Sequence, residues 1–574
     1  MRTGQTRLRF RILFTMSAHK ERLVASRRIL KIFPGAVPMF NASSSGTKSA
    51  TLRRGAVAVL AVLGLWSVGS LALAATKPNI VVIVNDDLGW GDVGYHGAEI
   101  RTPNLDALAK RGVELNRYYT YAVCSPMRAA LMSGRSSLET GVDAPIALDK
   151  VLPLDATLLP EHLKRAGYQT VMVGKWHLGQ AKTEYLPFKR GFDYYYGFLG
   201  GFIDHYTHLT PEGHLDWQRN GVSVREEGYT TDLFTADAIS QIKSRDKKKP
   251  LFLYLAYDAP HTPLQAPAEV VAKYADIADP IRRTYAAMVD HADAQIARVL
   301  ATIESEGMAK DTLILWVSDN GPETRGGGTS GGLRMGKGTS FEGGQRVPAI
   351  AYWPGHLEGG KKLDSVITVL DWFPTLITAA GGKVPQDKLI VGHDVMKTLR
   401  GDQVAKPAQM VMGNHAQRAG AYYESAYQWP WKIVRAPAAL LNGPQGPRPG
   451  GPGPGAAAGD AKVVLLFDVV ADPTESTDLA AANPQVVARL LADLDAAPRA
   501  AASLSEWGGN GRAGVGPGLG GPPGGGPPGG GPPAGGGGGD RLPGGGNALQ
   551  GYTVEKGEPV AEAAARGAAL TRGQ

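Results

Sequence analysis

The sequence predicts an α/β protein with a mostly parallel central sheet flanked by helices and a smaller C-terminal antiparallel sheet plus helix. Strand and helix patterns alternate from the end of the N-terminal leader to about residue 400, which is typical of a mostly parallel sheet. The first strand is a continuous, mainly β-branched run over residues 79–84, as expected for a strand buried on both faces. Two further strands and an amphipathic helix are predicted at residues 431–434, 463–467 and 483–496.

Capping residues predict where the main helices begin and end. Thr102 and Pro103 suit the start of a helix, and Gly112 suits its end. Residues 157–167 repeat that layout, and the longest helix is predicted over residues 280–307. Each of these helices follows or precedes a predicted strand, which supports the alternating α/β order.

The N-terminal leader accounts for the basic charge of the chain. Residues 1–75 hold twelve Lys and Arg and one acidic residue, so the remainder has a net charge of −3 although the whole chain has +8. A pair of arginines, an apolar run over residues 55–73 and a small-residue ending are typical of a secretory signal peptide. We therefore expect export to the periplasm or the medium, with Met39 as a possible start. No nucleic-acid partner is expected. Association with a membrane is expected only if the leader stays uncleaved.

Composition predicts four segments along the chain. Residues 1–75 are the leader, and residues 76–404 form the main α/β domain. Residues 405–505 form a C-terminal subdomain with a Gly/Pro-rich loop inserted between its two predicted strands. Residues 506–574 are a Gly/Pro-rich tail that lacks the apolar content to pack, so we predict disorder there.

Polar residues of metal-binding or acid–base types follow four of the predicted strands. The carboxyl ends of parallel strands meet at one edge of a sheet, where ligands bind in open α/β folds. We therefore expect these side chains to meet at one site, although any one of them alone fits an ordinary strand-to-loop boundary. The residues, in chain order, are Asp86, Asp87, Lys175, His177, His261, Asp319 and Asn320.

Two pairs among these residues suit a metal ion. Asp86 and Asp87 are adjacent carboxylates, and Asp319 and Asn320 form the second pair. Carboxylate and amide oxygens favour Ca²⁺, with Mg²⁺ as the alternative, over zinc. An isolated Asp-Asp pair is more often a solvated turn or a helix cap.

Cys124 is the only cysteine of the chain and opens the segment Cys-Ser-Pro-Met-Arg, which Ala-Ala-Leu-Met-Ser-Gly-Arg follows. A free cysteine is usually a small buried apolar residue. This segment, however, resembles the signature of the type I sulfatases, whose fold is alkaline-phosphatase-like. The resemblance implies that a formylglycine-generating maturation enzyme oxidises Cys124 to formylglycine (3-oxoalanine), whose hydrate is the nucleophile. Pro126 suits a first helical turn, from which Arg128 is expected to reach back to the modified side chain.

Other segments extend the resemblance over roughly residues 77–505. The segments over residues 174–179, 259–267 and 336–344 are similar to those of sulfatases. The resemblance implies that His261, with a lysine nearby, protonates the leaving alcohol and that His177 takes a proton as sulfate is expelled. The implied catalytic residues are Cys124, Arg128, Lys175, His177, His261 and Lys337. Those implied to bind substrate are Lys175, His261 and Lys337, and the implied metal ligands are Asp86, Asp87, Cys124, Asp319 and Asn320.

The resemblance also indicates a substrate class. Residues 190–193, 229–232 and 251–256 are similar to arylsulfatases of the N-acetylgalactosamine-4-sulfatase type. The expected activity is hydrolysis of a small-molecule or sugar sulfate ester, and Asp204 or His205 is expected to touch the substrate. One alternative is a phosphonate or phosphodiester hydrolase, although such enzymes commonly have His where this chain has Asn320. The other is a sulfated-glycan binder without turnover, which applies if Cys124 stays unmodified.

Overall fold

The computed structural model describes residues 77–146, 148–402, 410–415, 422–438, 462–502 and 504. Within this part of the chain, ten strands form one sheet, and its central strands β9, β1, β8, β4 and β5 are parallel. Antiparallel pairs join β10 to β9 and to β2 on one side and β6 to β5 and β7 on the other. The strands, in sheet order, are β11 (Lys361–Leu363), β2 (Val113–Leu115), β10 (Ala349–Tyr352), β9 (Thr312–Ser318), β1 (Asn79–Asn85), β8 (Leu251–Ala256), β4 (Gln169–Lys175), β5 (Tyr194–Phe198), β6 (Gln218–Arg219) and β7 (Val222–Ser223).

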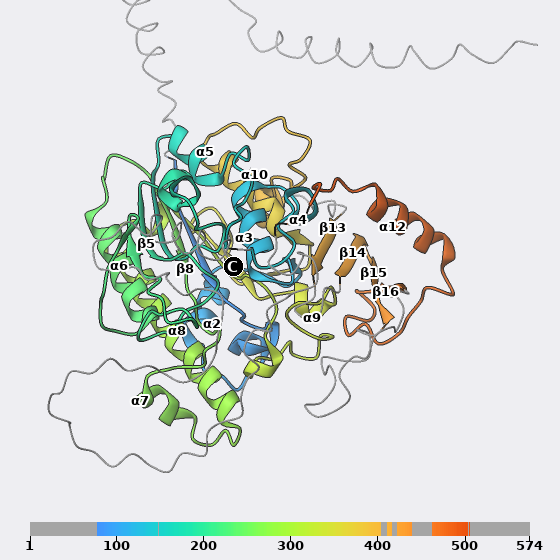
Figure 1. The fold of residues 1–574 in the computed structure, drawn as a ribbon, viewed down its shortest axis with the longest axis horizontal. Helices are drawn as coiled ribbons and strands as arrows, with labels where there is room; N and C mark the ends of the chain where they lie inside the picture. The colour runs from blue at the N-terminus through green and yellow to red at the C-terminus, as the bar shows by residue number, and fades with distance from the viewer. Residues whose placement is uncertain are drawn as a thin grey trace, which may run out of the picture. The chain divides into compact units, whose positions relative to one another are not determined.

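Alternate residues of the central strands enter two separate cores, one on each face of the sheet. In β1, Val82 joins one core and Ile83 the other, and Ile83 lies in register with Leu255 of β8 and Trp316 of β9. This alternation explains why the strands are apolar at every position. One core includes residues of α3 (Cys124–Ser133), α5 (Leu159–Arg165) and α10 (Val369–Ala379), and the other includes residues of α2 (Pro103–Arg111), α6 (Thr230–Ser244), α7 (Ala268–Val271) and α8 (Pro280–Ser305). The short helix α4 (Ser137–Thr140) contacts α3. Figure 1 shows α2, α6 and α8 on one side of the strands and α3, α5 and α10 on the other.

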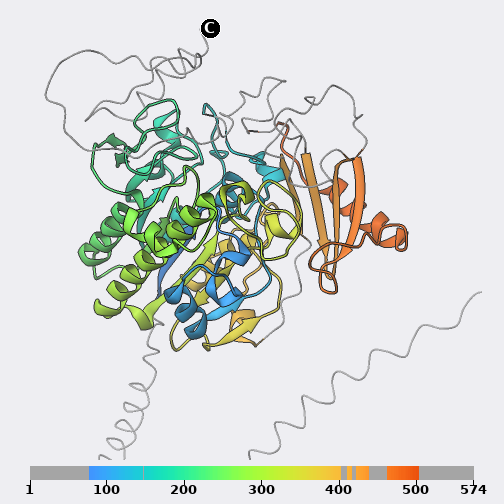
Figure 2. The ribbon, with the colours of Figure 1, turned by 90° about the horizontal axis from the view of Figure 1, so that it is seen from below.

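A second, antiparallel sheet lies C-terminal to the main one, as the sequence predicts. It runs in the order β13 (Met410–His415), β14 (Tyr422–Gln428), β15 (Trp431–Pro437) and β16 (Lys462–Asp468), and α12 (Pro484–Ala496) packs on it. Figure 2 shows these orange strands as a separate sheet. The buried Lys432 of β15 contacts Glu342 of α9 (Glu342–Gln345) at 3.1 Å and Glu475 at 2.8 Å. This charged contact fastens the second sheet to α9.

The remaining short elements complete the connections. Two strands, β3 (Tyr118–Tyr119) and β12 (Ile367–Thr368), form a parallel pair of their own. The other elements are α11 (Met396–Arg400) and the 3₁₀ turns η2 (Trp90–Asp92), η3 (Gly94–His96), η4 (Thr183–Tyr185), η5 (Pro187–Lys189), η6 (Ala272–Tyr274), η7 (Ala309–Asp311) and η8 (Thr324–Gly326).

The predicted fold class is confirmed, and so are most of the predicted element boundaries. Thr102 and Gly112 flank α2, and Asp279 caps α8 through a bond from the Ile281 N–H. In the helix predicted over residues 157–167, Leu158 occupies the N-cap position. The Glu161 carboxylate accepts a hydrogen bond from the backbone N–H of Leu158. The pattern did not reveal the short antiparallel strands at either side of the sheet, which have too few residues to show a period.

Several sequence predictions concern residues outside the described part. These are the leader over residues 1–75, the boundary between residues 404 and 405, the Gly/Pro-rich loop and the tail over residues 506–574. They stay predictions. In the part of the chain that the structure describes, no helix is long and apolar enough to cross a membrane.

The Asp279 cap provides a test of the fold. Replacing Asp279 with Ala removes the acceptor for the Ile281 N–H at 3.0 Å, so the free energy of unfolding should fall by about 1 kcal/mol. Urea denaturation followed by circular dichroism measures this change. Asp276→Ala is the matched control, since Asp276 is an exposed acid that does not occupy the cap position of α8. Equal effects of the two substitutions would contradict the assigned cap.

Candidate active site

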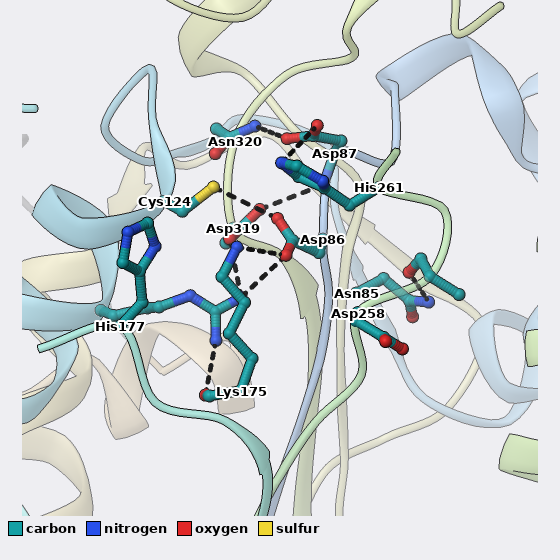
Figure 3. A network of polar contacts seen from close by, with 12 residues as sticks. Asn85, Asp86, Asp87, Cys124, Lys175, His177, Asp258, His261, Asp319 and Asn320 are labelled. Atoms are coloured by element: carbon teal, nitrogen blue, oxygen red, sulfur yellow. Dashed lines mark hydrogen bonds and ion pairs between the residues drawn. The ribbon is translucent and has the colours of Figure 1, made fainter. Parts of the chain in front are cut away.

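The carboxyl ends of β1, β4, β8 and β9 meet at one edge of the sheet, and the predicted site residues lie there. The strand ends supply the acids and the histidines, while α3 and the loop before α9 supply the thiol and two cations. Figure 3 shows the labelled side chains converging from these separate segments. The residues brought together are Asp86, Asp87, Cys124, Arg128, Lys175, His177, His261, Asp319, Asn320 and Lys337.

Asp86 lies at the centre of the cluster and is fully buried. The Cys124 thiol donates to Asp86 Oδ1 at 3.2 Å, and Lys175 Nζ donates to Oδ2 at 2.5 Å. Arg128 Nη2 lies 3.6 Å from the same Oδ2. Burial raises the pKa of Asp86, but Lys175, His261 and Arg128 outweigh it and hold the pKa below its ordinary value. Asp86 is therefore a carboxylate at neutral pH.

Asp87 is held by a different set of partners. Lys337 Nζ lies 2.7 Å from its carboxylate, and Asn320 Nδ2 donates to Oδ1 at 2.7 Å. His261 Nε2 lies 3.5 Å from Oδ2. Burial raises the pKa of Asp87, yet the charges of Lys337 and His261 bring the pKa below its ordinary value. The two neighbouring acids thus rely on different cations, which come from different parts of the chain.

Asp319 completes the acidic group at the end of β9. Arg128 Nη2 donates to Asp319 Oδ2 at 2.9 Å, and the Asp87 N–H donates to Oδ1 at 3.2 Å. Burial and the nearby Asp86 charge raise the pKa of Asp319. The Arg128 guanidinium thus bridges Asp319 and Asp86. That Arg128 also reaches the modified side chain of Cys124 stays a prediction.

Helix α3 holds Cys124 at its first residue, as Pro126 in the first turn predicts. Two bonds fasten this helix to the end of β4: Ser125 Oγ donates to the His177 carbonyl at 3.0 Å, and Arg128 Nη1 donates to the Lys175 carbonyl at 3.0 Å. The helix N-terminus favours negative charge at this position. The fold therefore fixes Cys124 between the β1 carboxylates and the β4 end.

The two histidines each contact the loop that follows β5. A Cβ placed at Gly201 would lie 3.1 Å from His177 Nε2, so the backbone there packs on the ring. The Phe202 ring stacks on the His261 ring with centroids 5.4 Å apart. His261 Nδ1 lies 2.7 Å from the Thr262 carbonyl oxygen, which only accepts. Nδ1 of His261 therefore carries a proton, and Nε2 faces the carboxylates.

Burial and the surrounding cations favour the neutral form of both histidines. Burial lowers the pKa of His177 well below its ordinary value, and Lys175 and Arg128 lower it further. Burial and Lys337 also lower the pKa of His261, although Asp87 and Asp86 partly oppose them. Neutral imidazoles at pH 7 can accept protons, which is the property that acid–base chemistry needs here.

The oxygen donors of the site fit a hard divalent cation. Ligand atoms of Asp86, Asp87, Cys124 and His261 all lie within 4.8 Å of one another. Asn320 Oδ1 is buried and has no hydrogen-bond partner among the described residues. A buried amide oxygen without a partner costs free energy unless something binds it, and Ca²⁺ or Mg²⁺ binds such oxygens. The residues present therefore fit the predicted metal ion.

Sequence reasoning missed a layer of residues behind His261. His205 Nδ1 lies 3.1 Å from Asp258 Oδ2, and His205 Nε2 lies 3.2 Å from the His261 carbonyl oxygen. Thr230 Oγ1 donates to Asp258 Oδ1 at 3.1 Å. The only signal in the sequence was that Asp258 precedes His261 by three residues. His205 is buried, and the Asp204 carboxylate accepts bonds from the N–H groups of Tyr206 and Thr207. That Asp204 or His205 touches the substrate stays a prediction.

The environment of Cys124 gives a test that needs no substrate. The thiol is buried, and burial together with Asp319 and Asp86 raises its pKa well above the ordinary value. Protein made without a maturation enzyme should therefore release almost no colour from Ellman's reagent at pH 8 when folded, and one equivalent when denatured. Rapid reaction of the folded protein would show that the thiol is accessible and contradict this geometry.

Comparisons with known proteins agree with the geometry. The sequence pattern of the family described as Sulfatase matches residues 78–382. The chain is 34% identical to arylsulfatase J of Mus musculus, over 72% of this chain and 75% of the relative. It is also 34% identical to N-acetylgalactosamine-6-sulfatase of Mus musculus, over 65% of this chain and 75% of that relative. The crystal structure of Ps i-CgsB in complex with k-i-k-neocarrahexaose has a TM-score of 0.65 and 32% identity, covering 73% of this chain and 92% of that one. The chain therefore belongs to the sulfatase family and is an enzyme that hydrolyses sulfate esters.

Proposed function

We propose that this sulfatase acts on the sulfate esters of sugars, with Cys124 in its formylglycine form and a bound Ca²⁺ ion. The observation that carries the proposal is the charge arrangement around Cys124. A sulfate ester is an anion, and Lys175, Lys337 and Arg128 gather beside the position from which the nucleophile acts. Cations in a buried site offset the repulsion between an anionic substrate and the nucleophile.

The sugar part of the proposal rests on relatives. The chain is similar to a mouse N-acetylgalactosamine-6-sulfatase and to a structure solved with k-i-k-neocarrahexaose. Residues 190–193, 229–232 and 251–256 are also similar to the N-acetylgalactosamine-4-sulfatase type. These similarities favour a sulfated saccharide over other sulfate esters.

Five positions would hold the divalent cation. Asp86, Asp87, Asp319 and Asn320 contribute oxygens, and the formylglycine derived from Cys124 would contribute the last. Ca²⁺ is favoured and Mg²⁺ is the alternative, because all of these donors are hard oxygens. When bound, the cation stabilises negative charge on oxygen and lowers the pKa of a bound hydroxyl, and the formylglycine supplies the nucleophile. His261 is left for proton transfer, because a nitrogen ligand is less suited to Ca²⁺.

The side chains around the ester divide into two roles. Lys175 and Lys337 bind the sulfate oxygens and stabilise the charge that develops there. His261 holds its Nδ1 proton against Thr262, so Nε2 is the nitrogen that takes up a proton from solvent when the anionic ester binds. Nε2 then donates that proton to the leaving alcohol, with Lys337 nearby. His177 is neutral and its Nδ1 has no partner among the described residues, which suits it to accept the proton that accompanies sulfate release.

Two other functions use the same residues. A phosphonate or phosphodiester hydrolase would share the nucleophile, and Asn320 argues against it. A sulfated-glycan binder without turnover would require that Cys124 remain a thiol. The sulfatase relatives favour sulfate ester hydrolysis over both.

Export and maturation follow from the same proposal. The signal-peptide pattern of residues 55–75 supports export to the periplasm or the medium. A formylglycine-generating enzyme of the host is then the maturation partner, and it must act on Cys124 before the helix α3 packs, because the folded thiol is buried.

Mass spectrometry of the tryptic peptide that contains Cys124, from protein made in its native host, tests the nucleophile. We expect the aldehyde, and we expect a kcat/KM for an aryl sulfate at least tenfold above that for the matching aryl phosphonate. Cys124→Ala should abolish sulfate release. An unmodified thiol in protein that releases no sulfate would favour the binder, and a preference for the phosphonate would favour the second hydrolase.

Removal of metal tests the cation site through stability as well as activity. Chelator-treated protein should gain several degrees in Tm when Ca²⁺ is added, since a ligand that binds only the folded state stabilises it. Asn320→Ala should weaken Ca²⁺ binding about tenfold, or roughly 1.4 kcal/mol, because it removes the unpartnered oxygen. Asn116→Ala, at a partly buried amide that donates to Asp364, is the control. A Ca²⁺ shift that Asn320→Ala leaves unchanged would refute this ligand set.

A further inference from the structure

The loop that follows β5, residues 200–205, contacts both histidines of the site. Gly201 packs against the His177 ring, and Phe202 stacks on the His261 ring with an angle of 28° between the planes. In the proposed reaction these histidines carry the protons of sulfate release and of the leaving alcohol. A loop that touches both of them borders the space through which the alcohol part of the substrate enters and leaves.

The same loop is held firmly from behind. His205 pairs with Asp258, and its Nε2 donates to the His261 carbonyl oxygen at 3.2 Å. The backbone N–H of His205 donates to Gln265 Oε1 at 2.9 Å. Gln265 Nε2 in turn donates to Asp204 Oδ2 at 2.7 Å. Burial lowers the pKa of His205, but Asp258 outweighs burial and raises it above the ordinary value. These contacts fix the loop against the segment that carries His261. The Phe202 side chain of the loop is therefore held in place before a ligand binds.

Only one large apolar side chain of this described loop faces solvent. Ile203 and His205 are each 1% exposed, and Asp204 accepts bonds from the N–H groups of Tyr206 and Thr207. Phe202 is 40% exposed although it stacks on the buried His261. One part of its ring therefore packs on a residue of the site while the rest is open to a ligand.

We infer that Phe202 is a specificity-determining residue whose exposed ring binds the pyranose ring of a sulfated sugar next to His261. The face of an aromatic ring carries negative charge density, and the C–H groups of a pyranose carry partial positive charge and an apolar surface. Ligand pockets commonly use aromatic walls in this way, with a few polar groups for orientation. The inference rests on the proposed function and adds the side chain that recognises the sugar itself.

Binding to a Cys124→Ala background tests the inference without turnover. The probes are N-acetylgalactosamine 6-sulfate and inorganic sulfate, measured by titration calorimetry with and without Phe202→Ala. We expect the Kd of the sugar sulfate to rise about fivefold to tenfold, as loss of an aromatic contact implies, and the Kd of inorganic sulfate to stay within twofold. Phe202→Trp should retain sugar affinity. Tyr206→Ala is the matched control, because Tyr206 directly follows this loop and is 42% exposed, but its ring lies on Tyr229.

Kinetics of the matured enzyme separate this role from support of His261. An increase of KM for the sugar sulfate with kcat within twofold, restored by Phe202→Trp, agrees with sugar binding. A fall of kcat with unchanged sugar affinity would mean that Phe202 only positions His261, and it would overturn the inference. Equal weakening of sugar sulfate and inorganic sulfate would also overturn it. Absence of turnover in the unsubstituted enzyme would instead refute the proposed function, and the calorimetric comparison would still decide the role of Phe202.

Discussion

Charge compensation at the edge of the central sheet is the constraint on which this site depends. Asp86, Asp87 and Asp319 are buried there, and isolated buried carboxylates would be too costly to keep ionised. Arg128, which donates to Asp319, and Lys175, which donates to Asp86, offset two of these charges. The three acids lie at the ends of β1 and β9, whereas their cations come from other segments. The site therefore exists only if α3, β4 and the loop before α9 are all in place.

The register of the parallel sheet helps to bring these charged groups together. Central strands that are apolar on both faces fix the positions of their own carboxyl ends, since Asn85 of β1 lies beside Ser318 of β9. The helix α3 is then tied to β4 through Ser125 and Arg128. On the other side, the buried Lys432 links the second sheet to Glu342, close in sequence to the loop that carries Lys337. Packing, rather than local geometry, thus sets the distances between the charges.

Much of the fold and of the site could be predicted because the relevant signals are local. Apolar runs marked the central strands, Asp279 marked the start of α8, and the segment after Cys124 was specific enough to indicate the chemistry. The short antiparallel strands β6 and β7 were missed, since two residues cannot display a period. The His205–Asp258 pair was missed because two buried, oppositely charged residues 53 positions apart look like ordinary surface polar residues in the sequence.

By itself, the sequence determined which chemical groups the protein has and in what local setting: a cysteine at a helix start, acids after strands, and histidines after strands. Only the tertiary structure decided which of these groups are partners. Arg128 pairs with Asp319, 191 residues away in the chain. The outward direction of Phe202 likewise depends on His205 and Asp258 behind its loop. The physical reason is that electrostatic and stacking interactions depend on distances of a few ångströms, which residues far apart in the chain reach only through packing.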